Sequence, residues 1–182
     1  YESIMAKSLL CAGTTWAGAW LAEDQRALDV LCAQPEVDPL RVGCGGLSGG
    51  GLRTCYLAGL DDRIACAVCV GMMTTWRDYL LNKSYTHTWM IYIPHLPREL
   101  DYPEILGLRA PRPTLVLNDV DDELFTLPEM LRADAMLAEI YAGIGCSDGY
   151  RCSYYPGPHK FDLPMQAEAF DWFDFWLGTV PN

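Results

Sequence analysis

The chain has 182 residues, of which 51% are hydrophobic and 20% are charged, a composition typical of a globular domain rather than a disordered one. Its formal net charge of −11 would repel nucleic acid and an anionic membrane surface, so we expect neither as a partner. No apolar run is long enough to cross a bilayer, and the first residues lack the basic start and apolar block of a signal peptide. We therefore expect a soluble single domain over residues 1–182.

The predicted elements alternate between helices and strands, which favours an α/β fold with a mostly parallel sheet flanked by helices. The runs "IACAVCVG" and "PTLVLN" are apolar throughout, as expected of strands that are buried on both faces. In the closing helix, Phe170, Phe173 and Trp176 are expected to face the core. In chain order the elements are a helix over 16–32, a strand over 41–45, a helix over 50–60, strands over 64–71 and 113–118, a helix over 127–142, a strand over 150–156 and a helix over 165–177.

Residues 72–108 interrupt this alternation with a less regular segment that is rich in aromatic side chains. We expect this excursion to cover the active site. Within it, Asp101 and Glu104 have the spacing of a capping box, which predicts the start of a short helix. No internal repeat or linker divides the chain.

The cysteines do not have the spacing of a metal site. Only Cys66 and Cys69 come close, but residues three apart on a strand point to opposite faces of the sheet. We expect most of the eight cysteines to be small buried hydrophobic residues. Cys146 and Cys152 flank the turn-rich stretch "CSDGYRC" and are the one pair that we consider for a disulfide.

The stretch "GLSGG" over residues 46–50 fits the G-x-S-x-G pattern of a nucleophile elbow between a predicted strand and a predicted helix. The sharp turn strains the backbone of Ser48 and brings Gly46 and Gly50 too close to their neighbours for a side chain. The helix that follows directs its free N–H groups at the serine, so the N–H of Gly49 is the expected oxyanion donor. A phosphate-binding loop would need Lys before Ser or Thr at its end, and a linker would not have apolar elements on both sides.

A serine nucleophile needs a base, and the base needs an orienting carboxylate. Four acids follow the strand "PTLVLN", and among them Asp122 is preferred, because Leu124 and Phe125 can anchor the loop behind it. The other three, Asp119, Asp121 and Glu123, are expected to be solvated loop charges. His159 follows the last predicted strand in "YYPGPHKFD", which completes the order Ser, Asp, His that this fold requires.

Several further residues are candidates for the substrate pocket. Met72 and Met73 follow the second predicted strand at the edge where ligands bind in such sheets. Trp89 and His87 lie in the aromatic excursion, and His87 and His95 are either structural or substrate-facing. No metal or other cofactor is expected.

These residues carry a resemblance to a known family. "QPEVDPLRVG", "GLSGGG", "APRPTLVLNDVDDELF" and "GPHKFDLPMQAEAFDWFDFWL" resemble the α/β-hydrolases, and within them the acetyl xylan esterase and dienelactone hydrolase branch. The resemblance covers residues 28–177. It implies a serine carboxylic ester hydrolase that acts without a cofactor on a small ester, such as an acetylated carbohydrate, with Ser48, Asp122 and His159 as catalytic residues.

The chain departs from that family in its length. The sequence predicts four strands, which correspond to the last half of the usual eight, and no segment supplies the second oxyanion donor. Because the first residue is Tyr1, we expect the natural N-terminus to be absent, which leaves the compartment unassigned. An N-terminal segment or a second chain would then complete the sheet, since the strand over 41–45 is otherwise an exposed edge.

Two alternatives remain open from the sequence. A serine peptidase or thioesterase could use the same triad, because neither the fold nor the triad fixes the leaving group. The chain could also be a catalytically degenerate hydrolase domain that serves as a binding module.

Overall fold

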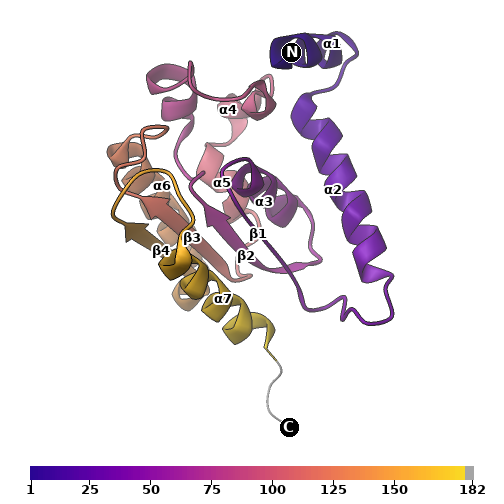
Figure 1. Ribbon diagram of the computed structural model, residues 1–182, viewed down its shortest axis with the longest axis vertical. Coiled ribbons are helices and arrows are strands. Elements are labelled where there is room, and N and C mark those ends of the chain that lie inside the picture. Colours follow the sequence, from indigo (N-terminus) through magenta and orange to yellow (C-terminus); the bar gives the residue numbers. More distant parts are fainter. Residues whose placement is uncertain (179–182) are drawn as a thin grey trace.

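The computed structural model describes residues 1–178 and contains one four-stranded sheet covered by helices (Figure 1). The strands pair in the order β1-β2-β3-β4, and every pair is parallel. Their carboxyl ends therefore meet at one edge of the sheet, and the predicted α/β fold class is confirmed. The strands are β1 (Val42–Leu47), β2 (Ile64–Val70), β3 (Thr114–Asp119) and β4 (Tyr150–Tyr155).

The helices follow the predicted order, with two additions, α1 and the one-turn helix α4. Helix α1 was not expected from the sequence, and Ala6 is its one buried residue. The other helix boundaries differ from the predicted ones by at most two residues. The helices are α1 (Glu2–Cys11), α2 (Trp16–Cys32), α3 (Gly49–Leu60), α4 (Leu96–Glu99), α5 (Tyr102–Gly107), α6 (Leu127–Gly143) and α7 (Leu163–Leu177), with short turns η1 (Asp78–Asn82), η2 (Trp89–Ile91) and η3 (Ser147–Gly149).

The sheet separates two apolar clusters. Helix α7 packs on one face, where Met165, Ala169 and Trp172 meet side chains of β2 and β3. The other face carries the larger cluster, to which α2, α3, α5, α6 and the aromatic excursion contribute. Cys66 belongs to the first cluster and Cys69 to the second, so the prediction that they point to opposite faces is confirmed.

The prediction for the buried face of α7 was partly wrong. Met165, Ala169 and Trp172 form the buried stripe, with the spacing of successive helical turns. Phe170 lies one position off this stripe and is 62% exposed, and Trp176 is 36% exposed. Of the three aromatic residues expected in the core, Phe173 alone packs against the apolar cluster.

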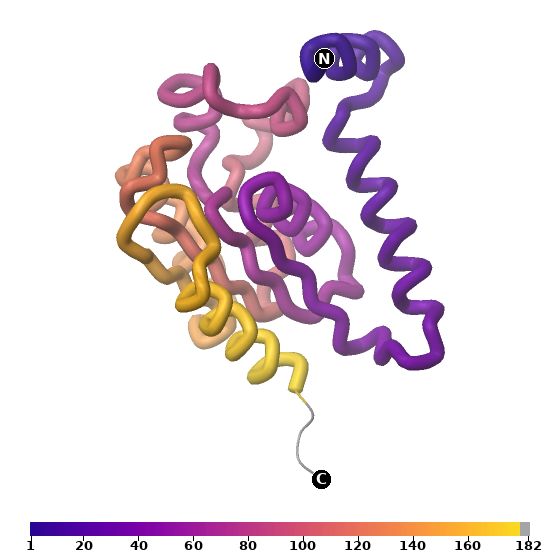
Figure 2. Tube along the Cα trace, viewed as in Figure 1, coloured from indigo at the N-terminus to yellow at the C-terminus, as the bar shows by residue number. Residues whose placement is uncertain are grey.

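The aromatic excursion is part of the main core. Trp76, Tyr79, Ile91 and Tyr102 are buried in the larger cluster. In Figure 2 the segment lies at the end of the molecule where α1 is found, and α1 contacts η2. The capping box at the start of α5 is confirmed, because the Asp101 side chain accepts from the backbone N–H of Glu104, and Glu104 Oε2 accepts from the backbone N–H of Asp101 at 2.5 Å. Asp101 Oδ1 also accepts from the backbone N–H of Tyr102 at 2.7 Å.

All eight cysteines are free thiols, so the disulfide considered for Cys146 and Cys152 is not formed. The Cys152 thiol instead accepts a hydrogen bond from Asn118 Nδ2 at 3.7 Å. Within residues 1–178, no helix is both long enough and apolar enough to cross a membrane.

Candidate functional site

Ser48 occupies the turn between β1 and α3. Its φ of 56° and ψ of −116° place a non-glycine residue in a sparsely populated conformation, which is strain of the kind that a nucleophile elbow stores. The turn is held by the Ser48 N–H, which donates to the carbonyl of Val70 in β2 at 2.9 Å. The side chain makes no capping hydrogen bond to α3, so its hydroxyl is not engaged by the helix end.

The steric prediction for the flanking glycines holds for Gly46 and is wrong for Gly50. A Cβ at Gly46 would lie 2.8 Å from the backbone of Gly50, whereas a Cβ at Gly50 would meet no atom within 4 Å. The second crowded position is Gly51, where a Cβ would lie 2.8 Å from the Val70 carbonyl and from Met72 Cβ. A side chain at position 51 would therefore clash with the end of β2, and glycine there allows α3 to pack closely against this strand.

Asp122 and His159 form a hydrogen-bonded pair at the carboxyl edge of the sheet. His159 Nδ1 lies 2.6 Å from Asp122 Oδ2, and the Asp122 side chain is 1% exposed. The other carboxylate oxygen accepts from the Leu124 N–H at 2.9 Å, which fixes the orientation of the carboxylate. The hydrogen bond to Asp122 raises the pKa of His159, because it stabilises the imidazolium form.

One of the neighbouring acids, Asp119, is less solvated than expected. Asp119 is fully buried, and its Oδ2 accepts from the Lys160 N–H at 3.0 Å, next to His159. Burial raises the pKa of Asp119. Asp121 Oδ2 accepts from the Gly157 N–H at 3.0 Å and so ties the acid loop to the histidine loop. The prediction of a solvated loop charge is wrong for Asp119, which is buried where the two loops cross at the sheet edge, whereas Asp121 and Glu123 are exposed as predicted.

The end of β2 lies between the serine and the histidine. Val70 accepts from the Ser48 N–H, and a Cβ at the next residue, Gly71, would lie 2.9 Å from His159 Cε1. His159 Nε2 is buried and has no hydrogen-bond partner among residues 1–178, so Ser48 does not donate to it in this structure. Such contacts are often long in unliganded enzymes and tighten with substrate. His159 Nε2, the ring nitrogen that does not contact Asp122, thus forms no hydrogen bond with residues 1–178.

Gly49 is the first residue of α3, directly after Ser48. The first N–H groups of a helix have no intrahelical acceptor, and the helix dipole adds positive potential at this end. An N–H at this position can bind an anionic oxygen, which is the role that the sequence predicts for Gly49.

The predicted pocket residues lie in different surroundings. Met72 and Met73 are buried, and Met73 is fully enclosed in the core. The His87 ring stacks on Phe125, with centroids 5.2 Å apart, and Phe125 is 6.5 Å from the His159 ring. His87 is therefore one aromatic ring away from the pair, and burial lowers the pKa of His87.

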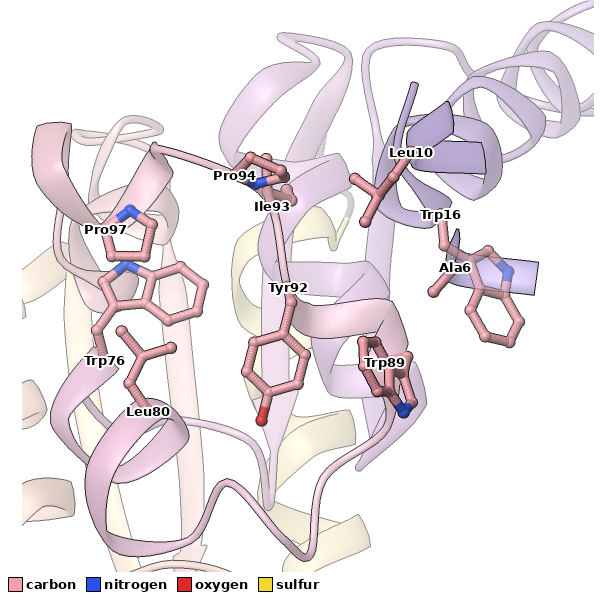
Figure 3. Close-up of a pocket in the computed structure, with 10 residues that line it drawn as sticks. All are labelled: Ala6, Leu10, Trp16, Trp76, Leu80, Trp89, Tyr92, Ile93, Pro94 and Pro97. Carbon is pink, nitrogen blue, oxygen red and sulfur yellow. The ribbon is translucent and has the colours of Figure 1, made fainter. Parts of the chain in front are cut away.

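Trp89 lies further away, in a mostly apolar cavity of about 180 Å³ between α1 and the excursion (Figure 3). The residues that line this cavity do not include Ser48, Asp122 or His159. The lining includes Ala6, Leu10, Trp16, Trp76, Trp89 and Tyr92.

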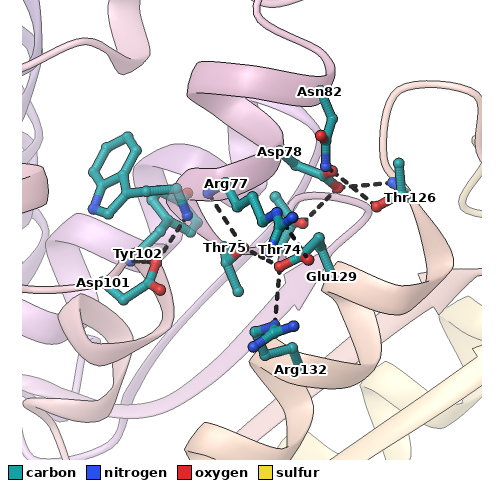
Figure 4. Close-up of polar contacts among 11 residues, drawn as sticks. Thr74, Thr75, Arg77, Asp78, Asn82, Asp101, Tyr102, Thr126, Glu129 and Arg132 are labelled. Carbon is teal, nitrogen blue, oxygen red and sulfur yellow. Dashed lines mark hydrogen bonds and ion pairs between the residues drawn. The ribbon is translucent and has the colours of Figure 1, made fainter.

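Sequence reasoning missed a buried polar cluster behind the acid loop. Asp78, at the start of η1, is fully buried and bonded to the end of that loop (Figure 4). An acid in an irregular aromatic segment gives no periodic signal of burial, so no pattern pointed to it. Within residues 1–178, no group of three or more His, Cys, Asp or Glu side chains could hold a metal ion.

Comparison with known proteins relates the chain to a hydrolase by sequence. No family model matches the sequence. The chain is 32% identical over 179 residues to "Putative hydrolase YtaP" of Bacillus subtilis (strain 168), an alignment that covers 97% of this chain and 59% of that protein. The chain thus spans less than two thirds of the length of this curated relative.

Solved structures of esterases are similar to this chain in fold. A glucuronoyl esterase of carbohydrate esterase family 15 from Caldicellulosiruptor kristjansonii superposes with a TM-score of 0.73 at 19% identity, covering 91% of this chain and 51% of that one. "Methylesterase BT1017" superposes with a TM-score of 0.68 at 24% identity, covering 88% and 36%. The fold is the α/β-hydrolase fold, in a part that corresponds to about half of these esterases or less.

The chain is similar to a hydrolase by sequence and to esterases by fold. The narrower branch indicated by its motifs, that of acetyl xylan esterases and dienelactone hydrolases, remains a prediction.

Proposed function

We propose that the protein is a serine hydrolase that cleaves carboxylic esters, with Ser48 as nucleophile, His159 as base and Asp122 as the orienting acid. One observation carries this proposal: the buried Asp122 carboxylate binds His159 Nδ1 at 2.6 Å, at the sheet edge where Ser48 holds its strained backbone. A carboxylate in this position selects the tautomer whose Nε2 can accept a proton. That nitrogen is free of protein partners among residues 1–178.

In the proposed reaction, His159 Nε2 removes the hydroxyl proton as Ser48 Oγ attacks the ester carbonyl. The N–H of Gly49 stabilises the oxyanion of the tetrahedral intermediate. His159 then donates the proton to the departing alcohol, which leaves an acyl-serine. Water repeats the sequence with His159 as base, releases the acid and restores Ser48.

For the substrate we propose a small acyl ester of a carbohydrate, such as an acetylated sugar. The motif resemblance favours an acetyl ester, and the structural relatives are themselves carbohydrate-directed or methyl esterases by description. Met72 and His87 are proposed as pocket walls, because they lie beside the elbow helix and beside the Phe125 ring that faces His159. Residues 72–108, including Trp89, are proposed to form the cover of this pocket.

We also propose that the free edge of β1 accepts a further strand, from a preceding segment or from a second chain. Within residues 1–178, β1 is hydrogen-bonded to β2 alone. The relatives carry longer chains than this one, which supports an additional segment as the source of both a strand and a second oxyanion donor.

A fluorophosphonate probe tests the proposal. The protein in its full encoded length should be labelled covalently at Ser48, and the Ser48→Ala variant should not be labelled. A folded protein that resists the probe would contradict the serine hydrolase proposal and favour the binding-module alternative. Hydrolysis of p-nitrophenyl acetate should exceed that of longer acyl esters, thioesters and anilides, and preference for the anilide or the thioester would favour the peptidase or thioesterase alternative.

A further inference from the structure

Asp78 is a buried carboxylate whose partners are all hydrogen-bond donors. Its Oδ2 accepts from Thr74 Oγ1 at 2.8 Å and from the Thr126 N–H at 2.7 Å. Its Oδ1 accepts from Asn82 Nδ2 and from Thr126 Oγ1, each at 2.8 Å. The side chain is fully buried, and it forms no ion pair within residues 1–178. Four donors compensate a buried charge that would otherwise be costly, so this carboxylate holds its partners in fixed positions.

The partner that matters for the site is Thr126, the last residue of the loop that carries Asp122 (Figure 4). Thr126 is the N-cap residue of α6, yet its hydroxyl does not cap the helix and binds Asp78 instead. Lys83, the residue that follows η1, makes a second contact with the acid loop. Its Nζ donates to the Glu123 carbonyl at 2.7 Å. Turn η1 and the residue after it thus hold the acid loop on both sides of Leu124.

The other end of the acid loop is fixed by the sheet. The Val120 N–H donates to the Tyr155 carbonyl of β4 at 2.9 Å. Between these two anchors, Asp122 makes its contacts to His159 and to the Leu124 N–H. Phe125, one residue before Thr126, packs edge-on against Tyr79, the neighbour of Asp78, with centroids 6.0 Å apart. A shift of Thr126 would therefore be transmitted to Asp122 over four residues.

We infer that Asp78 is a positioning residue that acts through the acid loop to hold Asp122 on His159. This inference rests on the proposed function for its meaning, since it assigns Asp78 to the same site. Asp78 touches neither the reacting atoms nor His159, and its effect passes through Thr126. Its role would be to keep the carboxylate within hydrogen-bond distance of Nδ1, where a displacement of about 1 Å can cost about 100-fold in rate.

Three variants separate positioning from simple stabilisation. Asp78→Ala removes all four contacts. Thr126→Val keeps the shape of the side chain but removes its bond to Oδ1, without loss of a helix cap. Asp78→Asn is the conservative variant: its oxygen can keep the bonds to Thr74 and to the Thr126 N–H, and its amide can donate to a reoriented Asn82 and to the Thr126 hydroxyl.

Glu129 offers a matched control, because it also ties the excursion to α6. Its Oε2 accepts from Thr75 Oγ1 at 2.6 Å and pairs with Arg132 Nε at 3.2 Å, and the side chain is 6% exposed. Glu129 lies on the helix and not on the acid loop. Glu129→Gln should therefore lower stability without changing the geometry at Asp122.

The test uses the full encoded protein and two measurements on its folded fraction. The first is the low-field proton resonance of the His159 Nδ1–H, assigned by its loss in His159→Gln. The second is the rate of fluorophosphonate labelling at Ser48 and the pH midpoint of that rate. The charged groups facing His159 are Asp122 and Asp119, and only the contact to Asp122 should change.

Asp78→Ala should shift or broaden the resonance, lower the labelling rate by about 100-fold and lower its pH midpoint. Thr126→Val should give a smaller loss in the same direction, and Asp78→Asn should restore most of the rate. An unchanged resonance and rate in folded Asp78→Ala and Thr126→Val would overturn the inference, as would an equal loss in Glu129→Gln. If the unsubstituted protein is not labelled at all, the proposed function fails, while the resonance still reports separately on whether Asp78 positions the pair.

Discussion

The two glycines that flank Ser48 in the G-x-S-x-G pattern differ in what a methyl group would meet. A Cβ at Gly46 would lie 2.8 Å from the Gly50 backbone, which cannot move without displacing the start of α3. We expect Gly46→Ala to lower the free energy of unfolding by about 1–3 kcal/mol and to abolish labelling of Ser48. Chemical denaturation and the fluorophosphonate assay measure the two effects.

Gly50→Ala serves as the matched control for that prediction. Its Cβ would meet nothing within 4 Å, and alanine favours a helix by about 0.4–1 kcal/mol over glycine at a compatible position. We expect equal or higher stability with labelling retained. Comparable damage from both substitutions would mean that the elbow is crowded on both sides, contrary to the geometry at Gly50.

The His159–Asp122 pair predicts a definite pH dependence. The hydrogen bond that His159 donates to Asp122 raises the pKa of His159 above its usual value of about 6.5. In the proposed mechanism His159 must be neutral to act as base, so the labelling rate should rise with pH through a midpoint above about 6.5. Asp122→Asn should lower this midpoint and reduce the rate by about 10⁴-fold. A midpoint that stays in place in the variant would separate Asp122 from the base.

The raised pKa of His159 also makes the stability of the fold depend on pH, and the direction of this dependence is fixed. His159 binds its proton more tightly in the folded state, so its contribution is fully present below the unfolded pKa of about 6.5. It is lost as the pH rises through the higher folded pKa. Denaturation curves between about pH 5 and pH 9 should therefore show a loss of stability over this window that is absent in His159→Gln.

Among individual site residues, the sequence could predict those that follow the ends of strands. Asp122 and His159 come directly after β3 and β4, and parallel strands bring such loops to one edge. It did not indicate Asp78 or the burial of Asp119, because both depend on which loops cross in space. Local patterns carry no information on such long-range contacts.

Among the helices, α5 shows how a single cap joins distant segments. Asp101 Oδ1 accepts from the N–H of Tyr102 and also from the N–H of Trp76 at 2.8 Å, which lies 25 residues earlier. We expect Asp101→Ala to cost about 1–2 kcal/mol, near the upper end of the range for N-caps, because two donors lose their acceptor. Thermal or urea unfolding measures the change.

Asp162, the N-cap of α7, is the control for this prediction. It accepts one backbone bond, from the Met165 N–H at 3.4 Å, and it is partly exposed. Asp162→Ala should therefore cost clearly less than Asp101→Ala. Equal costs would show that the contact to Trp76 adds nothing to the cap.

The elements themselves were predictable where their sequence pattern was unambiguous. The apolar runs of β2 and β3 are strands buried on both faces, and the capping box marks the start of α5. The buried face of α7 was harder to assign, because it carries aromatic side chains nearly all round. Since 163–177 contains Phe170, Phe173, Phe175 and Trp176, hydrophobicity alone could not select the stripe that packs.

At the scale of the whole molecule, the sheet leaves the outer edge of β1 unpaired among residues 1–178. This edge is a strand with three glycines, Gly43, Gly45 and Gly46, beside a hollow lined by Phe161, Phe170 and Phe173. Free strand edges next to apolar surface favour pairing with another chain. The four-strand architecture could be predicted because each strand has its own signal, whereas nothing in the sequence could show what borders β1.

We expect residues 1–182, prepared alone, to associate as their concentration increases, which sedimentation velocity measures as a rising sedimentation coefficient. Amide exchange in β1 should be slower in the full encoded protein than in residues 1–182 at low concentration. A stable monomer with equally protected β1 amides in both forms would contradict the proposal that this edge accepts a strand.

Gly71 gives the site a property that none of its polar residues provides. It has a φ of +55°, and a Cβ there would stand 2.9 Å from His159 Cε1. The imidazole thus occupies space next to the residue that follows β2, space that any side chain at position 71 would fill. Replacement of this glycine would displace the ring while leaving the serine, the acid and the histidine chemically intact. Under the proposed function, a substitution at position 71 should give a protein that binds an ester without cleaving it, which would be a tool for capturing the substrate.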